Sequence, residues 1–286
     1  MSEKDDKAGT LYVVATPIGN LSDVSARMRE TLEEVDLVAA EDTRTVGVFL
    51  ARLGIEARQT SLFEGNEVKK SQELIAQLKE GETVALVCEA GTPGISDPGA
   101  HLVAQAVEAG VRVTPIPGPC AATAALSASG LPTRRFFFEG FLPKAKGRRR
   151  ERLEALSHLA ATLVFYESPR RLQKTLAEMG EVLGDPRRAV VAREITKLHE
   201  ELVRGTLGEL VRRFVETPPR GEVTVLVEGA EEKGEWSTAE MEEAVEEAVA
   251  LGQDSPSRLA KRLAREGGWK RRQVYELILE RTRGGG

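Results

Sequence analysis

The sequence has few of the residues that build disulfide frameworks and metal sites. Its 286 residues include two cysteines, Cys88 and Cys120, and three histidines. Two cysteines are too few for a disulfide framework and fit a reducing compartment. The histidines, His101, His158 and His199, lie far apart and lack the spacing of zinc ligands. We therefore expect no metal site.

Long apolar runs and a strong excess of either charge are also absent. No apolar run is long enough to cross a membrane, and the N-terminal MSEKDDKAGT lacks the apolar core of a signal peptide. The formal charge is -5, from 40 Lys+Arg and 45 Asp+Glu, so the chain as a whole is not a polycation. Any nucleic-acid binding must come from local basic patches. We expect a cytoplasmic protein with no membrane partner.

The first half of the chain alternates between apolar strand-like runs and helical patterns. Strands are predicted at 11–15, 37–40, 84–88 and 111–116. Ser22 is expected to cap the first helix. This alternation predicts an α/β domain over 10–130, with a mainly parallel sheet covered on both faces.

The stretch VALVCEAGTPGISDPG, residues 84–99, is the centre of this half. A buried strand runs into a loop rich in glycine and proline, which is where open α/β sheets hold small ligands. Asp97 and Pro98 are expected to cap and start a helix over 99–109 that buries Val107. The alternative is a tight crossover loop with no ligand.

Two further features of the first half bear on function. No G-x-G-x-x-G follows the first strand, so a standard dinucleotide-binding enzyme and a common Rossmann-like methyltransferase are disfavoured. The charged cluster at 41–44 follows a strand at its carboxyl end, where it is a candidate site. A solvated surface turn is the alternative.

The second half predicts another α/β domain, over 131–230, with strands at 136–141, 162–166, 189–192 and 222–228. Residues 144–152, KAKGRRRER, hold six Lys/Arg and one Glu. Cations near a helix N-terminus oppose the helix dipole, and a phosphate partner would relieve that conflict. The alternative is a solvated helix start.

Residues 235–286 predict a separate helical module. Ser237 and Glu240 form a capping-box pattern for a helix that ends at Gly252, and a basic helix follows from Ser255. The glycine pair at 267–268 separates it from a last basic helix, as in helix-turn-helix modules. The module binds RNA on this interpretation, and packing against the main body is the alternative.

The chain resembles a known family in six segments, which lie in collinear order over roughly residues 10–230. They are LYVVATPIGNLSD, AAEDTR, CEAGTPGISDPG, PIPGPCAATAALSASGLP, FYESPRR and REITK. Together they are similar to one branch of the tetrapyrrole-methylase superfamily, the bacterial enzymes that methylate a cytidine ribose 2′-hydroxyl in the decoding region of small-subunit ribosomal RNA. The resemblance implies two α/β domains, S-adenosylmethionine in the cleft between them, ribosomal RNA or the small ribosomal subunit as partner, and a homodimer.

The chain departs from that branch in two places. It has Leu62-Phe-Glu-Gly-Asn66 where relatives often have a histidine-containing stretch, and Glu89 where they often have aspartate. The first departure leaves the role of that loop open, whereas the second keeps the charge.

The resemblance also implies site residues. The donor would be bound by Pro17, Cys88, Glu89, Ala90, Gly91, Thr92, Ile95, Cys120, Ala121, Tyr166 and Thr224. RNA would be held by Arg44, Arg148, Arg149, Arg170 and Arg193. Cys88 is then a buried strand thiol and not a nucleophile, because no histidine partner is near it in the sequence pattern.

Methyl transfer to a hydroxyl also needs a group that takes the proton. The candidates are Glu41, Asp42, Glu167, Glu194 and Lys197. We favour Lys197 positioned by Glu194 and keep Glu167 in the predicted catalytic set. A surface Glu–Lys pair with no catalytic role is the alternative.

Two other functions fit the same fold. A small-molecule tetrapyrrole methylase would not need the basic stretch at 144–152 or the basic C-terminal helices. A non-catalytic RNA-binding factor would keep the fold without methyl transfer.

Overall fold

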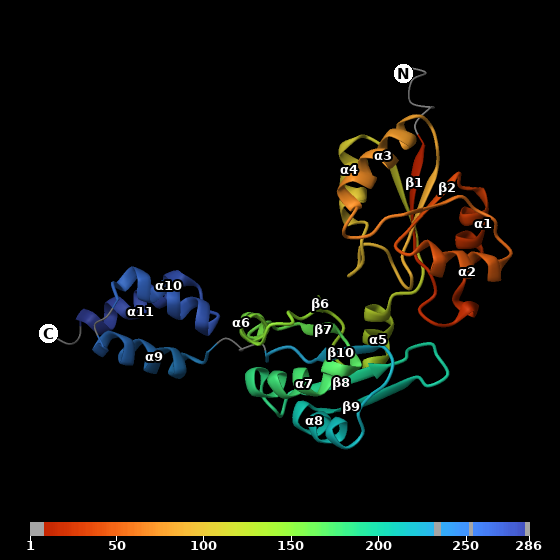
Figure 1. The fold of residues 1–286 in the computed structure, drawn as a ribbon. Coiled ribbons are helices and arrows are strands. Elements are labelled where there is room, and N and C mark those ends of the chain that lie inside the picture. The colour runs from red at the N-terminus through yellow and green to blue at the C-terminus, as the bar shows by residue number, and fades with distance from the viewer. Residues whose placement is uncertain (1–8, 232–235, 252–253, 284–286) are drawn as a thin grey trace. The chain divides into compact units, whose positions relative to one another are not determined.

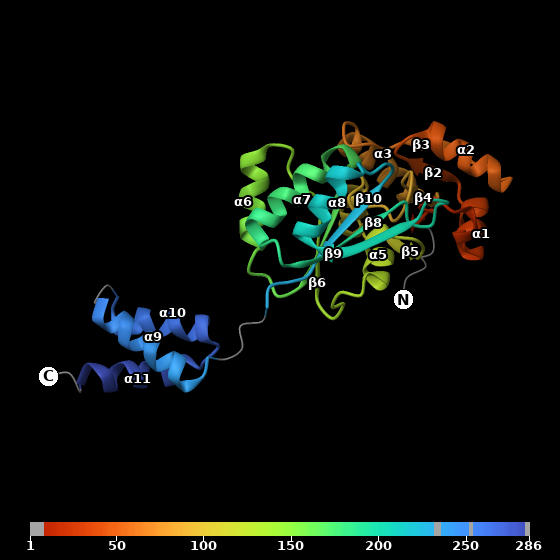
Figure 2. The ribbon, with the colours of Figure 1, turned by 90° about the horizontal axis from the view of Figure 1, so that it is seen from below.

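The computed structural model describes residues 9–231, 236–251 and 254–283. Contacts divide the chain into two compact units, residues 1–229 and 230–286. In the part of the chain that the structure describes, the two β-sheets lie in the first unit and the second unit is helical (Figures 1 and 2). Among the described residues, no helix is long and apolar enough to cross a membrane.

The first sheet is parallel throughout, as predicted. Its strand order is β3-β2-β4-β1-β5, and the strands are β1 Thr10–Val14, β2 Leu37–Ala40, β3 Gln59–Ser61, β4 Val84–Val87 and β5 Arg112–Ile116. The helices of this half are α1 Ala26–Glu34, α2 Thr43–Leu53, α3 Glu67–Lys79 and α4 Ala100–Glu108. Two separate apolar clusters form, one containing Leu74 and Leu102 and the other Met28 and Leu50. The sheet is therefore covered on both faces.

Three predictions about helix starts and faces in this half are wrong. Ser22 lies in a short 3₁₀ turn, η2 Leu21–Asp23, and Ser25 caps α1 by accepting the Met28 N–H at 3.1 Å. Asp97 does not cap α4, which begins at Ala100 after Gly99.

The cap of α4 comes instead from a distant residue. The Glu67 carboxylate, in the first turn of α3, accepts the N–H groups of Gly99 at 2.8 Å and His101 at 3.1 Å. Asp97 therefore does not contribute to this helix cap. Val107 is 63% exposed, because the buried face of α4 is formed by Leu102 and Ala106.

The second sheet is mixed, with order β6-β7-β10-β8-β9 and only the β6–β7 pair parallel. Its strands are β6 Phe136–Phe141, β7 Thr162–Glu167, β8 Arg188–Arg193, β9 Glu201–Thr206 and β10 Val223–Val227. Helices α6 Lys146–Leu156, α7 Pro169–Leu183 and α8 Leu207–Glu216 supply the core on one face.

Helix α5 Ala121–Ser129 covers the other face of this second sheet. Its Ala122, Ala125 and Leu126 pack against Val164 and Leu226 of the sheet. The small side chains of the predicted Ala-rich face allow this close packing. Since α5 follows directly from β5, it joins the two halves of the first unit (Figure 1).

The basic helix α6 is mostly neutralised from within the protein. Arg150 pairs with Glu154 and Glu181, and Arg152 pairs with Glu139 at 2.6 Å. Arg149 is 8% exposed and bonds Glu178 at 2.6 Å. The prediction that Arg149 contacts RNA is therefore wrong, because its guanidinium is buried against a carboxylate of the same chain.

The described residues of the second unit form the helices α9 Thr238–Leu251, α10 Pro256–Gly267 and α11 Arg271–Arg283. Its core contains Met241, Val245, Leu259, Leu263, Val274 and Ile278. The predicted capping box is confirmed, since Ser237 Oγ accepts the Glu240 N–H at 3.3 Å and the Glu240 carboxylate accepts the Ser237 N–H at 2.8 Å. The predicted helix end at Gly252 lies outside the described residues.

The buried Arg149–Glu178 pair gives a stability prediction. Glu178→Ala leaves the Arg149 charge buried without its partner and is expected to lower the free energy of unfolding by about 3 kcal/mol. Glu181→Ala, one turn away on α7 and exposed, is the matched control and is expected to change it by less than about 0.5 kcal/mol.

Urea unfolding followed by far-UV circular dichroism measures both variants. Tryptophan fluorescence does not suit this purpose, because Trp236 and Trp269 both lie in the second unit. Equal effects of the two substitutions would show that the buried pair contributes no more than a surface pair.

Candidate functional site

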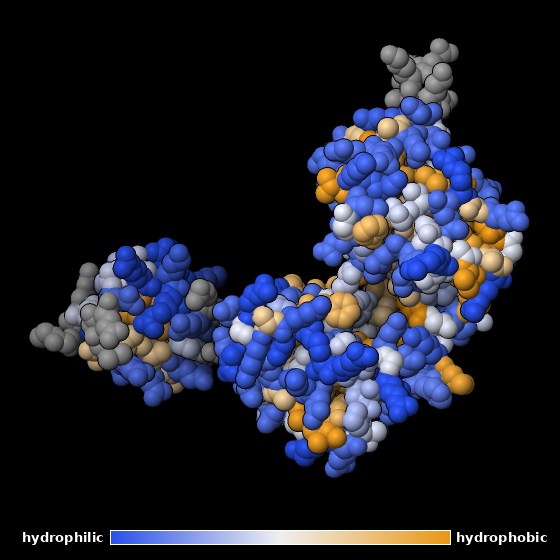
Figure 3. Space-filling model, viewed as in Figure 1, coloured by the Kyte–Doolittle hydropathy of each residue, from blue (hydrophilic) through white to orange (hydrophobic). Residues whose placement is uncertain are grey.

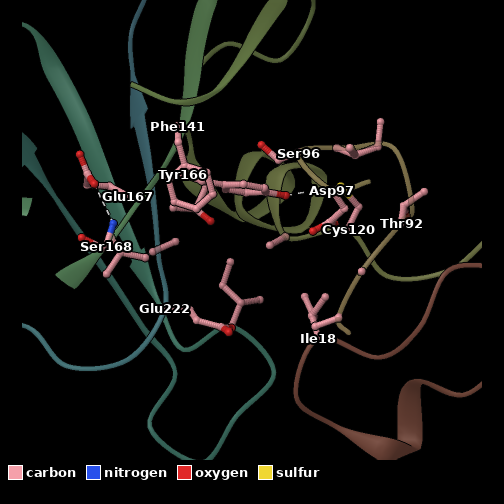
Figure 4. A pocket seen from close by; sticks show the side chains of 18 of the residues that line it. Ile18, Thr92, Ser96, Asp97, Cys120, Phe141, Tyr166, Glu167, Ser168 and Glu222 are labelled. Carbon is pink, nitrogen blue, oxygen red and sulfur yellow. Dashed lines mark hydrogen bonds between the residues drawn. The ribbon is translucent and has the colours of Figure 1, made fainter. Parts of the chain in front are cut away.

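A cavity of about 360 Å³ lies where the loops of the first sheet face the second sheet. Both halves of the first unit line it (Figure 4). The recess between these halves exposes apolar surface among hydrophilic surroundings (Figure 3). The lining residues are Ile18, Ala90, Gly91, Thr92, Ile95, Ser96, Asp97, Cys120, Ala121, Phe141, Tyr166, Glu167, Ser168, Pro169, Ala192, Ile195, Glu222, Val223 and Thr224. A volume in this range is typical of small-molecule sites.

Hydrogen bonds tie together the loops that follow β1, β4 and β5. Thr16 and Gly91 exchange main-chain bonds of 2.8 and 3.1 Å. The buried Thr16 hydroxyl donates to the Cys88 carbonyl at 3.2 Å, and the Thr92 hydroxyl donates to the Pro119 carbonyl at 3.1 Å. Parallel strands bring these loops to one edge of the sheet, and the hydrogen bonds then fix the main chain that forms the cavity wall.

The two halves meet where glycines leave room for a side chain from the opposite half. The backbone of Gly19 has φ +145°, and a Cβ there would lie 2.4 Å from Lys197 Cγ. Gly140 has φ +72°, and a Cβ there would lie 2.6 Å from Ser96 Oγ. Both positions therefore require glycine, for conformation and for close approach.

Tyr166 links the loop after β5 to the second sheet. Its hydroxyl accepts the Ala122 N–H at 3.2 Å and lies 3.9 Å from Cys120 Sγ. The edges of Phe138 and Phe141 approach its ring, with centroids 5.0 and 5.7 Å away. Burial raises the pKa of Tyr166, so the side chain presents a neutral hydroxyl to the cavity.

Acidic groups gather at the carboxyl edge of the first sheet. Burial raises the pKa of Asp97, and the charge of Glu89 raises it further, although a hydrogen bond from the Cys88 thiol acts in the opposite direction. Burial also raises the pKa of Glu41, and the neighbouring charges of Asp97, Glu89 and Asp42 add to the effect. A nearby positive charge would stabilise the ionised form of each of these carboxylates.

Asp42 and Arg44 form a separate exposed pair at the start of α2. The Asp42 carboxylate accepts the Arg44 main-chain N–H at 2.8 Å and its guanidinium at 2.6 Å. These hydrogen bonds lower the pKa of Asp42 to about 2. Asp42 is therefore a helix cap and a weak base.

Lys197 is held by two carboxylates beside the cavity. Its Nζ lies 3.0 Å from Glu194 Oε1 and 2.9 Å from Glu222 Oε2. Burial alone would lower the pKa of Lys197, but its bonds to Glu222 and Glu194 outweigh burial and raise it. Lys197 is therefore a stable ammonium group.

Glu194 organises the loop that carries this lysine. Its Oε1 accepts the Glu222 N–H at 2.9 Å, and that bond is the main reason that the pKa of Glu194 is lowered. Glu194 and Thr196 have φ values of +50° and +68°. Two non-glycine residues in this region store strain, which a functional site tolerates when its surroundings hold them in place.

Glu167 lines the cavity, but its carboxylate is already bonded. It is buried and accepts the Ser168 N–H at 2.7 Å and the Thr175 hydroxyl at 2.6 Å. Arg171 lies 3.4 Å away. Glu167 therefore fixes the start of α7 instead of offering a free oxygen.

The structure brings most of the predicted donor-binding residues together. Eight of them line the cavity, namely Ala90, Gly91, Thr92, Ile95, Cys120, Ala121, Tyr166 and Thr224. Pro17, Cys88 and Glu89 are not among the described lining residues. Pro17 and Cys88 are buried behind the wall, and Glu89 is exposed.

The predicted RNA-binding arginines differ in their exposure to solvent. Arg44, Arg148 and Arg170 are exposed. Arg193 is half-buried, and its guanidinium donates to Glu201 at 3.1 Å and to the Arg220 carbonyl at 3.4 Å.

Ten of the nineteen lining residues were not predicted as site residues, among them Asp97, Phe141 and Glu222. Asp97 was assigned to a helix cap, Phe141 to a strand and Glu222 to the first position of another strand. The available signal was position, since each lies at or near the end of a strand or in the glycine-rich loop. The pairing of Glu222 with Lys197, 25 residues away, has no local signature.

The two thiols are expected to differ in reactivity. Cys88 is 1% exposed, and burial raises its pKa, whereas Cys120 is half-buried and lines the cavity. Native protein treated with iodoacetamide should be alkylated at Cys120 well before Cys88, as followed by peptide mass spectrometry. Both thiols should react at similar rates in urea, and faster native labelling of Cys88 would contradict its placement.

Comparison with known proteins identifies a family and relatives that this chain resembles. Residues 10–211 match the family described as Tetrapyrrole (Corrin/Porphyrin) Methylases. The chain is 46% identical over 280 residues to Ribosomal RNA small subunit methyltransferase I of Escherichia coli O157:H7, with 96% of each chain covered. The protein of the same name from Mesorhizobium japonicum is 46% identical over 272 residues, covering 94% of this chain and 91% of that protein.

Solved structures share the fold at lower identity. Uroporphyrin-III-C-methyltransferase from Thermus thermophilus matches with TM-score 0.55 and 23% identity, covering 76% of this chain and 94% of that one. Diphthine synthase matches with TM-score 0.59 and 18% identity, covering 77% and 90%. The predicted fold class is confirmed, and the chain belongs to the family of tetrapyrrole methylases.

Proposed function

We propose that this protein uses S-adenosylmethionine to methylate the RNA of the small ribosomal subunit, at the ribose 2′-hydroxyl of a cytidine. The observation that carries the proposal is 46% identity over 96% of the chain to a protein named as a small-subunit ribosomal RNA methyltransferase. The cavity between the two sheets supports a small-molecule donor site, and the exposed arginines support an RNA partner.

The residues of the cavity fit the donor. S-adenosylmethionine supplies a methyl group on a positively charged sulfur. The fixed loop from Ala90 to Thr92 offers main-chain groups, and Ile95 and Ala121 offer apolar walls for an adenine ring. The acids near Asp97 favour a bound cation, as their raised pKa values indicate.

We propose a division of work between the halves. Thr92, Ile95, Cys120 and Ala121 hold the donor from the first half, with Ala90 and Gly91, while Tyr166 and Thr224 hold it from the second half. Holding the donor in one orientation supplies the alignment on which an in-line displacement depends. The hydrogen-bonded loops and the interlocked glycines supply the rigidity that this alignment needs.

The proposed catalytic group centres on Lys197 and Glu194 beside the mouth of the cavity. Because Lys197 is a stable ammonium group, it acts as a cation that positions its carboxylate partners and not as the proton acceptor favoured from the sequence. Glu167 is a positioning residue in this proposal, because its hydrogen bonds hold the N-terminus of α7.

RNA is proposed to contact Arg44, Arg148 and Arg170, which are exposed, and Arg193, which is half-buried. Arginine neutralises phosphates, which supplies much of the affinity for RNA. The second unit adds its own basic surface, since Arg258, Lys261 and Arg262 are exposed on α10. A helix pair joined by a glycine turn suits such a role.

The remaining partner and compartment proposals follow from the same function. We propose a homodimer, as the family resemblance implies. We propose that the protein acts in the cytoplasm, because ribosomal RNA is its proposed substrate.

A second candidate function is methylation of a small tetrapyrrole. It draws on the fold shared with uroporphyrin-III-C-methyltransferase, at 23% identity. The near-full-length similarity to the ribosomal RNA enzymes favours the RNA substrate.

Transfer of labelled methyl groups separates these candidates. The purified protein is incubated with methyl-labelled S-adenosylmethionine and, in parallel, with free small-subunit ribosomal RNA, assembled small subunits and precorrin. We expect label on one of the RNA samples, resistant to alkaline hydrolysis at one cytidine because the 2′-oxygen is blocked. Label on the tetrapyrrole alone would overturn the proposed substrate, and no label on any acceptor would overturn the proposed activity.

A further inference from the structure

The carboxylates that line the cavity differ in what they already hold. These lining acids are Asp97, Glu167 and Glu222. Glu167 is buried and accepts hydrogen bonds from a main-chain N–H and from the Thr175 hydroxyl, with an arginine at 3.4 Å. Its oxygens are therefore occupied within the protein, and it cannot approach a substrate hydroxyl without breaking those bonds.

Asp97 lies in the glycine-rich loop after β4. It is half-buried and receives a hydrogen bond from the thiol of Cys88, which belongs to the wall behind the cavity. Nearby Glu89 adds a second negative charge. Asp97 is thus less accessible to a polymeric acceptor than an exposed carboxylate would be, and its negative surroundings suit a donor of positive charge.

Glu222 has a different environment at the open edge. Its side chain is 72% exposed, and Oε2 accepts from Lys197 Nζ at 2.9 Å. Its main-chain N–H is fixed by Glu194 at 2.9 Å, directly before β10 Val223–Val227. Among the described residues no bond to Oε1 is found. The bond from Lys197 to Oε2 therefore orients the carboxylate, while Oε1 remains open to a ligand.

Lys197 also contacts the opposite half of the first unit. Its methylene chain lies over Gly19 of the first half, where a Cβ would come within 2.4 Å of it. Ile18, next to that glycine, lines the cavity together with Glu222, and Figure 4 shows both side chains. The Glu222 carboxylate is therefore set by contacts from both halves.

We propose that Glu222 is the catalytic residue that takes the proton from the acceptor hydroxyl, with Lys197 as its positioning residue. This inference rests on the proposed function. A polymeric acceptor can reach only accessible groups, and Glu222 is the most exposed of the three lining carboxylates.

The step balances in atoms and charge. The 2′-oxygen forms a bond to the methyl carbon, the carbon–sulfur bond breaks with its electron pair passing to sulfur, and the hydroxyl proton passes to Glu222. The products are a 2′-O-methyl ribose, an uncharged thioether and a neutral carboxylic acid, which then releases its proton to water.

The test compares Glu222→Gln with Glu228→Gln, a control at the far end of the same strand, where Glu228 pairs with Arg188. Single-turnover methyl transfer to the RNA acceptor gives the rate, and calorimetry gives the affinity for S-adenosylhomocysteine. We expect Glu222→Gln to slow transfer by about 10²- to 10⁴-fold, with the affinity for S-adenosylhomocysteine changed less than about threefold. The control should match the wild type in both measurements.

A double-mutant cycle tests the role of Lys197. Lys197→Met should slow transfer without weakening S-adenosylhomocysteine binding, and Lys197→Arg should restore part of the rate. Adding Glu222→Gln to Lys197→Met should cost little more, because residues that act through one another are not additive. Fully additive losses would overturn the positioning role.

The outcomes also separate this inference from the proposed function. A wild-type protein that methylates no RNA refutes the function itself. An active wild type with an equally active Glu222→Gln variant refutes only the Glu222 assignment, as does a variant that loses S-adenosylhomocysteine binding. Loss of turnover in Asp97→Asn, with full turnover in Glu222→Gln, would assign the proton to Asp97.

Discussion

The main-chain pairing of Thr16 with Gly91 is the interaction on which the site depends. It joins the loops after β1 and β4 through two hydrogen bonds, and the buried Thr16 hydroxyl adds a third, to the Cys88 carbonyl. Loops on a sheet edge are ordinarily mobile. Here they are tied into one wall, in which the small residues Ala90 and Gly91 let a ligand approach the backbone closely.

The second half completes the site because it is locked to that wall at several points. Helix α5 packs its alanines on the second sheet, Tyr166 accepts the Ala122 N–H, and Lys197 and Ser96 each lie over a glycine of the opposite half. Small residues at these contacts let the halves approach closely. The result is a cavity with a rigid inner wall and an open edge, where Lys197 and its two carboxylates lie.

Much of this arrangement could be predicted from the sequence, because periodicity and glycine-rich loops are local signals. The parallel sheet and eight cavity residues followed from them and from the family resemblance. Two of the failures have long-range causes. Glu67, 32 residues away, replaced Asp97 at the start of α4, and Glu178 neutralised Arg149. Strand β9 and helix α8 were missed although a Thr206–Glu209 capping box marks their junction.

The proposed function requires that the cavity between the two sheets hold the methyl donor. A crystal structure of the protein with S-adenosylhomocysteine would show whether it does. We expect the ligand to lie against Thr92 and Cys120 on one side and Tyr166 and Thr224 on the other, with its sulfur facing the side of the cavity where Glu222 lies. A ligand bound elsewhere on the chain, or a cavity that stays empty at saturating ligand, would contradict it.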